Sequence, residues 1–459
     1  MNEIEAVGDE SLLLPLQQGV DTKERPWLYA LLIAPSAVLM NGVVQGGVLS
    51  YVMRQQGVGI GHISEIIGLI SLPTSLYFFW SPITDFLVQR RTWVLLGALS
   101  AGVLMAAAFR ESNLAARSAI VVMLLAACCS QLVVSSCGGM MGALHTERAR
   151  RVASSSYQAG SAGFGAAAAF LLILVGSHDQ GLTAHAAAGD WWQRLVNTLD
   201  NLLVHLAAVA GGWHRLLILL VAALIVLPGL FALTVPRQVA SDHEAFGMVM
   251  HRLGIEFKST FWRWAAIPYT LLMLFPMNSG AAVGLLPGIA RDYGVSGAQV
   301  AWMNGFGGTI LMAVGSASAT LIPAKIRASV SYLVVGIVNA ATLSVLWFGS
   351  MRPAAYFLGS TLYLFTVGMG LATFTAVVLE FMGRSGKSGS GRYSIINSMG
   401  NVPVLYMIRL DGWGGDKWGA RGLAGTEVVV SAAGALILLA YFITRKNSGT
   451  APARIGVAD

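Results

Sequence analysis

Amide side chains lie inside several apolar stretches of this chain, where they are the groups best placed to do chemistry. Asn41 and Gln45 are four residues apart and share one helix face, as do Asn397 and Asn401. An amide donates and accepts hydrogen bonds, which suits binding the uncharged polar part of a solute. Polar groups are costly against lipid, so we expect them to line a wet cavity. The predicted cavity residues are Asn41, Gln45, Gln131, Asn278, Asn304, Tyr363, Asn397 and Asn401.

Each of these side chains could instead hydrogen-bond a neighbouring helix, a contact worth about 0.6 kcal/mol on average in membranes. Near mid-depth the predicted spans show no clear acid or base, so the sequence predicts no deeply buried proton relay. Three glutamates at the ends of predicted spans, Glu65, Glu147 and Glu380, are the remaining candidates for coupling to an ion. A structural charge at a helix end is the alternative for each.

Signals for an enzyme are weak. No histidine falls in the middle of a predicted span, and His145 and Glu147 have the wrong spacing to ligate a metal from one helix face. The stretch "GRSGKSGSGR" at 383–392 resembles a phosphate loop, but the pattern requires glycine where the chain has Phe381. We therefore expect no catalytic residue, no metal and no cofactor. A membrane-embedded enzyme is the less favoured alternative.

The composition places the chain in a membrane. Hydrophobic residues make up 55% of it and charged residues 11%, and its mean hydropathy is +0.67. Soluble domains carry about 25% charged residues, so a lipid bilayer is the solvent that this chain prefers. The net charge of +7 fits an excess of lysine and arginine in cytoplasmic loops. No cluster of basic and aromatic residues supports nucleic-acid binding.

Twelve apolar runs approach the ~20 residues with which a helix crosses a bilayer. With the N-terminus inside, the predicted cytoplasmic segments hold 19 of the 29 lysine and arginine residues, which predicts both termini in the cytoplasm. The sequence thus predicts an all-α integral membrane protein with twelve transmembrane helices in two six-helix halves. The predicted spans are 27–53, 63–83, 93–109, 118–142, 155–176, 213–235, 264–290, 298–322, 329–349, 354–380, 393–410 and 425–443.

Two connections interrupt the regular spacing of the spans. The long outside connection at 177–212 carries leucines at helical spacing and two tryptophans, so we expect an interfacial helix or a partial lid. The polar stretch at 236–263 separates two groups of six spans. The predicted organisation is a cytoplasmic tail at 1–26, an N-terminal half at 27–235, a cytoplasmic linker at 236–263, a C-terminal half at 264–443 and a cytoplasmic tail at 444–459.

One pattern occurs twice, 237 residues apart. "NGVVQGGVLSYVMRQQGV" at 41–58 and "NSGAAVGLLPGIARDYGV" at 278–295 agree at six of eighteen positions. The same offset aligns Arg90 with Arg327. Parallel duplication of a six-span half is typical of transporters that rock about a central site. We therefore expect the first residues of the two copies, Asn41 and Asn278, to occupy related positions across the cavity.

Residues 77–97, "YFFWSPITDFLVQRRTWVLLG", end the second predicted span and begin the third. This stretch resembles the "F-x-W-x-P-x-x-D … R-R" signature of AmpG-type permeases in the major facilitator superfamily, whose relatives transport muropeptides, siderophores or acetyl-CoA. The chain departs from that family at Gly142, where an acid is common, and at "GSAGFG", which begins the fifth span. The matching residues are Trp80, Pro82, Asp85, Arg90 and Arg91.

A charged loop of this kind suits a cytoplasmic gate. Asp85 can face a helix N-terminus or an arginine, and Arg90 and Arg91 can meet an acid from the fourth span. Glu147, in "ALHTERAR", is the predicted partner. The alternative is a cytoplasmic anchor of positive charge with no gating role.

The resemblance implies a secondary transporter that imports a bulky organic solute together with protons across the cytoplasmic (inner) membrane by alternating access. The solute would be of the muropeptide, siderophore or nucleotide-conjugate kind. Expected partners are this solute, the proton and the lipid bilayer, and a monomer is the expected state. A receptor of the same shape, which binds solute without moving it, is the alternative in another class.

Overall fold

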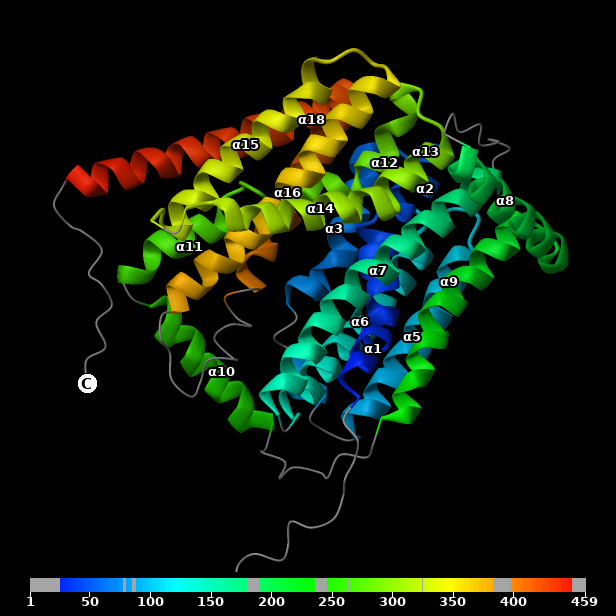
Figure 1. Cartoon of the computed structure of the whole chain (residues 1–459), viewed down its shortest axis with the longest axis horizontal. Helices are drawn as coiled ribbons and strands as arrows, with labels where there is room; N and C mark the ends of the chain where they lie inside the picture. The colour runs from blue at the N-terminus through cyan, green and yellow to red at the C-terminus, as the bar shows by residue number, and fades with distance from the viewer. Residues whose placement is uncertain are drawn as a thin grey trace, which may run out of the picture.

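The computed structural model describes residues 25–76, 80–84, 88–144, 146–179, 190–235, 246–262, 264–323, 325–382, 396 and 398–447. Every regular element in these ranges is a helix (Figure 1). Eight of the described helices are long and apolar enough to cross a membrane. The prediction of an all-α, multi-pass membrane protein is confirmed.

The first span is built from several short helical pieces. The turn η2 (Pro26–Leu28) leads into α1 (Tyr29–Ser36) and a π-helical stretch, η3 (Ala37–Val44). After a break at Gly47, α2 (Val48–Gln55) continues in the same direction. The other elements of this half are α3 (Ile60–Ser75), α4 (Trp80–Thr84), α5 (Arg90–Phe109), α6 (Arg117–Gly142), α7 (Glu147–Asp179), α9 (Trp213–Gly229) and η5 (Leu230–Thr234).

The C-terminal half contains two broken spans. The seventh comprises η6 (Trp264–Ala266), α11 (Ile267–Leu274), η7 (Ala281–Gly284), α12 (Leu286–Ile289) and η8 (Ala290–Tyr293). The eighth comprises α13 (Gly297–Trp302), η9 (Met303–Gly307), α14 (Gly308–Ser318) and η10 (Ala319–Leu321). The remaining helices are α15 (Ala328–Phe348), α16 (Pro353–Met382) and α18 (Asn401–Asn447).

Helix α18 supplies two spans, because its backbone leaves helical geometry at Trp418 and Gly419. We call the parts before and after this break its first and second arms. Together with α3 and the two broken spans, the eight apolar helices account for twelve spans. The first arm continues to Lys417. The sequence predicted that this span, the eleventh, ends at residue 410.

The two six-helix halves meet most closely at one end of the molecule, which we call the closed end (Figure 1). There α3 packs against α18, α7 against α13, and α2 against α12. The largest apolar core includes residues of both halves, such as Leu49 and Leu286. At the opposite end each half has a smaller core of its own, one around Val133 and one around Leu333. The hydrophobic core is therefore shared at the closed end and divided at the other.

The repeat is visible in the backbone. Gly57 and Gly294, 237 residues apart, both adopt left-handed conformations, with φ of 82° and 70°. Each glycine donates to the carbonyl three residues earlier, and the following valine donates to the carbonyl five residues earlier. This is a Schellman turn in both copies. Farther along, the helix starts differ by 238 residues, because α5 begins at Arg90 and α15 at Ala328.

Two helices lie outside the twelve spans. Helix α8 (Asp190–Ala210) falls in the long predicted outside connection and packs against α9. Its Asp200 Oδ1 lies 2.8 Å from His178 Nε2, and the His178 ring stacks on Trp213. The position of α8 as an interfacial helix or a partial lid on the outside stays a prediction. Helix α10 (Phe246–Phe261) lies in the predicted linker, near the end opposite the closed end (Figure 1).

Candidate functional site

Glycines allow the two halves to approach closely at the closed end. Gly47 has a φ of 84° and faces the ring of Pro287 with no room for a Cβ. Its repeat partner Gly284 lies against the backbone of Gln45, where a Cβ would be 3.4 Å from the carbonyl oxygen. Both copies of the repeat therefore line the contact between the halves. Only Gly47 lies so close to the other half that no side chain fits at its position.

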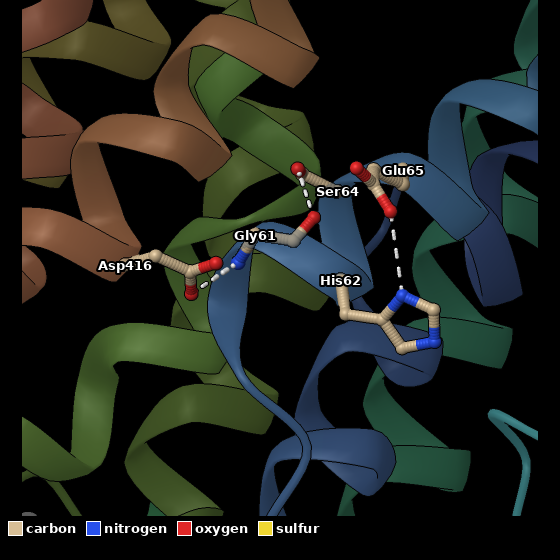
Figure 2. A network of polar contacts seen from close by, with 5 residues as sticks. All are labelled: Gly61, His62, Ser64, Glu65 and Asp416. Carbon is tan, nitrogen blue, oxygen red and sulfur yellow. Dashed lines mark hydrogen bonds and ion pairs between the residues drawn. The ribbon is translucent and has the colours of Figure 1, made fainter.

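A carboxylate from the C-terminal half caps a helix of the N-terminal half (Figure 2). The Gly61 N–H donates to Asp416 Oδ1 at 2.8 Å. Helix α3 has no side-chain cap of its own, because its N-cap residue is Gly59. Free N–H groups at a helix N-terminus favour a negative charge. Beside this bond, Gly412 of α18 lies against Ser64 of α3 with no room for a Cβ.

A polar face of the N-terminal half extends away from the closed end. Asn41 is exposed within the otherwise buried stretch Ala37–Val44, and its amide donates to Ser161 Oγ at 2.9 Å. On α7, Ala166 and Phe170 lie against Gly305 of the other half. Earlier turns of the same α7 face carry Ser155, Gln158 and Ala162, all exposed. This face therefore continues the contact surface into the space between the halves.

The opposing face carries an arginine. Arg409, in the first arm of α18, is exposed and packs beside Gly68 of α3. Its guanidinium forms no hydrogen bond or ion pair with the residues that the structure describes. A charge inside a transmembrane span is costly against lipid. Because α3 lies directly across from it, we place Arg409 on the surface between the two halves.

Several predicted cavity residues instead join helices to each other. Gln131 is buried and donates to Thr74 Oγ1 at 2.9 Å. Asn304 is partly buried and donates to the Tyr356 hydroxyl at 3.3 Å. Tyr363 is fully buried. The structure thus places these side chains in helix–helix contacts of the kind that the sequence left as the alternative.

The two repeat asparagines occupy different environments. Asn278 is buried, adopts a φ of 54° and donates to the Tyr332 carbonyl at 3.0 Å, whereas Asn41 is exposed in a π-helical stretch. Gln45 and Asn401 are half-buried. Asn397 lies outside the described residues.

Part of the predicted gate can be located. Arg90 Nη1 donates to the Gly139 carbonyl at 2.6 Å, and Arg91 Nη1 donates to the Val235 carbonyl at 3.1 Å. Both arginines thus bind carbonyls near the C-terminal ends of helices, where a positive charge is favourable. Asp85 and the side chain of Glu147 lie outside the described residues. Trp80, from the same motif, donates its indole N–H to the Pro73 carbonyl at 3.1 Å.

Sequence reasoning missed a pair of buried carboxyl groups. Asp411 in the first arm of α18 and Glu427 in the second arm are both fully buried. The sequence predicted no clear acid or base near the middle of a span, and the two buried carboxyl groups of α18 correct that prediction; the same helix also contains Arg409. Residues 411–424, which include five glycines at 412–422, lie between the predicted eleventh and twelfth spans. A glutamate only two residues into a predicted apolar span was the signal that could have exposed the error.

The glutamates proposed for coupling lie elsewhere. Glu65 is exposed near the closed end, where its Oε2 lies 3.4 Å from His62 Nδ1 (Figure 2). Glu380 of α16 accepts a hydrogen bond from the Tyr269 hydroxyl at 2.9 Å. Neither is in contact with the buried carboxyl pair.

Solved structures share this architecture. A bacterial homolog of the human lysosomal transporter Spinster, in an inward-facing and unoccupied conformation, covers 93% of this chain and 96% of its own, with a TM-score of 0.60 and 14% identity. The chain has the major facilitator fold. The nucleoside transporter NupG matches with a TM-score of 0.63 and 11% identity, covering 91% of this chain and 99% of its own.

A D-xylose–proton symporter covers 90% of this chain and 95% of its own, with a TM-score of 0.60 and 11% identity. At these identities the likeness shows the fold alone. No family model matches the chain, and no curated protein matches it.

Proposed function

We propose that this protein is a secondary active transporter that moves a bulky organic solute carrying an anionic group by alternating access. The observation that carries the proposal is Arg409, an exposed guanidinium without a protein partner among the described residues, on the surface between the halves. A guanidinium binds carboxylate or phosphate through charge-assisted hydrogen bonds. Asn41, on the facing half, adds an amide for an uncharged part of the same solute.

The division of the core supports alternating access. A shared core at one end and separate cores at the other are what a rocking pair of halves requires. The excess of lysine and arginine at the ends of α5 and α15, opposite the closed end, supports assigning that side to the cytoplasm. On that assignment both termini are cytoplasmic and this conformation opens inward.

The finer assignment rests on the resemblance around Trp80 and on Arg90 and Arg91. It makes the protein an AmpG-like permease of the cytoplasmic membrane that imports muropeptide-, siderophore- or nucleotide-conjugate-like solutes by proton symport, acting as a monomer. Such solutes carry carboxylate, hydroxamate or phosphate groups, which fits a cationic side chain in the site. The proposed organisation has six-helix halves at 27–235 and 264–443, with a linker at 236–263.

Exchange of solute across a membrane tests this proposal. Proteoliposomes preloaded with unlabelled muropeptide, and others preloaded with ferric siderophore, should accumulate the matching labelled compound by counterflow. The Arg409→Gln variant should lower exchange by about tenfold or more, because a hydrogen bond to a charged group contributes about 1.5–3 kcal/mol. Arg421→Gln is the matched control. Arg421 is also an exposed arginine of α18, but it lies just after the break between the two arms, and its guanidinium donates to the Gly349 carbonyl.

Saturable binding without exchange would instead identify a receptor. Chemical conversion of the labelled compound would identify a membrane enzyme. Normal exchange in Arg409→Gln would remove the anion-binding role of Arg409.

A further inference from the structure

The buried carboxyl pair lies at one depth in the C-terminal half. Asp411 precedes the break at Trp418 by seven residues, and Glu427 follows the break at Gly419 by eight. At ~1.5 Å per residue, the two lie about 10 Å and about 12 Å from the break. The two arms are antiparallel, so the two carboxyl groups come to a similar depth and face each other.

Hydroxyl groups serve one carboxyl and leave the other without a donor among the described residues. Glu427 Oε1 accepts from Ser279 Oγ at 3.0 Å and from the Tyr363 hydroxyl at 3.3 Å. Ser431 Oγ lies 3.5 Å from the same oxygen but donates its proton to the Pro276 carbonyl at 2.8 Å. In the part of the chain that the structure describes, neither oxygen of Asp411 has a hydrogen-bond donor, and Glu427 Oε2 also lacks one. Buried polar atoms without a partner are rare and costly. The unsatisfied atoms of the two carboxyl groups are thus left for each other.

No basic side chain balances the pair among the described residues. None of the ion pairs there involves Asp411 or Glu427. The other titratable groups that face the pair are the neutral hydroxyls of Tyr363, from α16, and Tyr406, from the first arm. Two adjacent carboxylates without a counter-charge would be very costly in this environment. One proton held between the two carboxyl groups removes a charge and satisfies both.

We propose that Asp411 and Glu427 form a proton-binding site whose occupancy favours the closed end. The hydroxyl groups of Ser279 and Tyr363 stabilise charge on Glu427, so Asp411 holds the proton and donates a hydrogen bond to Glu427. Loss of that proton leaves two facing carboxylates, which only water can solvate. The step is a simple binding equilibrium between the pair and a proton from solution.

The segments that hold the pair also form the closed end. Gly412, next to Asp411, lies against Ser64 of the other half. Ser279, which bonds Glu427, also accepts from the Ala281 N–H at the start of η7, the turn that ends at Gly284. Separation of the halves would therefore move both sides of the pair and admit water. Proton binding and the closed end are linked through these shared residues.

This inference rests on the proposed function and supplies its coupling site, but its test needs no solute. The full-length protein, with Cys128, Cys129 and Cys137 replaced by alanine, would carry spin labels at S112C and A354C. These positions are exposed at the closed end, one in each half. Distance distributions in lipid nanodiscs would be recorded from about pH 5 to about pH 9, and the open-to-closed ratio should rise about tenfold or more with pH.

Asp411→Asn and Glu427→Gln should remain largely closed across the whole range, because an amide cannot lose the charge-determining proton. Asp416→Asn is the matched control: it weakens the cap on α3 at every pH and should keep the pH response. A wild-type ratio that is constant with pH would overturn the proposal. So would an unchanged pH response in both carboxyl variants, or a shift produced by sodium chloride at constant pH, which would indicate a metal cation.

Infrared difference spectra give a second readout that does not depend on conformation. The wild type should show the carbonyl band of a protonated carboxylic acid at low pH, and Asp411→Asn should lose it. Persistence of the full band in Asp411→Asn would overturn the assignment. If counterflow fails while the pH response is intact, the proposed transport function is wrong and the proposed proton-binding site is still supported.

Discussion

The two copies of the repeat have the same turn and different supports. In both, a Schellman turn at Gly57 or Gly294 leads into a helix, and the residues before these helices are Gly59 and Ser296. Ser296 caps α13 with its own side chain and forms a reciprocal capping box with Gln299. Gly59 has no side chain, and the N-terminus of α3 is capped from the other half by Asp416.

The cap on α13 therefore stabilises the fold of one half, whereas the cap on α3 stabilises one arrangement of the two halves. The cap on α13 is local and persists in any arrangement of the halves. The cap on α3 exists while the halves are together, so its free energy contributes to the closed end and not to the fold of the N-terminal half. The same position of the duplicated turn therefore carries a cap within one half in one copy and depends on a bond between the halves in the other.

Substitution of the paired glycines should show the largest asymmetry. In Gly47→Ala, the left-handed φ costs roughly 1–2 kcal/mol and the new methyl group meets the Pro287 ring. We expect the closed population, measured by the same distance distributions, to fall by tenfold or more. Gly284→Ala adds a Cβ at ordinary van der Waals separation from Gln45 and should change it less than about twofold. Equal effects of the two would contradict the asymmetry.

The repeat asparagines should differ in what they support. Asn278→Ala loses the bond to Tyr332 and places alanine at a φ of 54°, so the free energy of unfolding should fall by about 1–3 kcal/mol. Asn41→Ala should leave thermal stability in detergent near the wild-type value and weaken solute binding. Asn278→Gly keeps the backbone and loses the amide, which isolates the side-chain bond. Unchanged solute affinity in Asn41→Ala would remove that residue from the site.

Removal of the helix caps should give the smallest effects. In one copy it should change the conformational equilibrium, and in the other it should change the stability of the fold. Asp416→Asn should shift the conformational equilibrium by about 1 kcal/mol and leave unfolding nearly unchanged. Ser296→Ala should lower stability by a similar amount and leave the equilibrium in place. Thermal melts and distance distributions on both variants check this. A stability loss in Asp416→Asn without a conformational shift would make its bond a plain structural cap.

The sequence was informative wherever hydrophobic length or turn chemistry decides the structure. Twelve spans follow from apolar runs, and the repeated pattern at 41–58 and 278–295 ends in the same glycine turn in both copies. The fate of individual amides did not follow, because a polar side chain in a span can face a neighbouring helix or the space between halves. Gln131 and Asn304 are bonded to neighbouring helices, whereas Asn41 bonds Ser161 of α7 and still remains exposed.

The carboxyl pair was hidden for a different reason. Residues 411–424 lie between two predicted spans, but in α18 the glycines of this stretch permit close contact with α3, as at Gly412 and Gly415. Local propensity and tertiary packing give opposite answers there, and packing prevails. The predicted end of the eleventh span at residue 410 placed Asp411 in water, whereas the helix continues and buries it.

The last two spans also constrain the order in which the chain can be completed during synthesis. The unwound stretch of the seventh span is tied by Ser431, which donates to the Pro276 carbonyl, and by Tyr406, which donates to the Leu274 carbonyl. These partners are synthesised 132 and 155 residues after the carbonyls that they bind. Until they insert, these carbonyls of the seventh span lack their partners within a membrane, where unsatisfied backbone groups are costly. The C-terminal half should therefore stay exposed to quality-control proteases until the two arms of α18 have entered the bilayer.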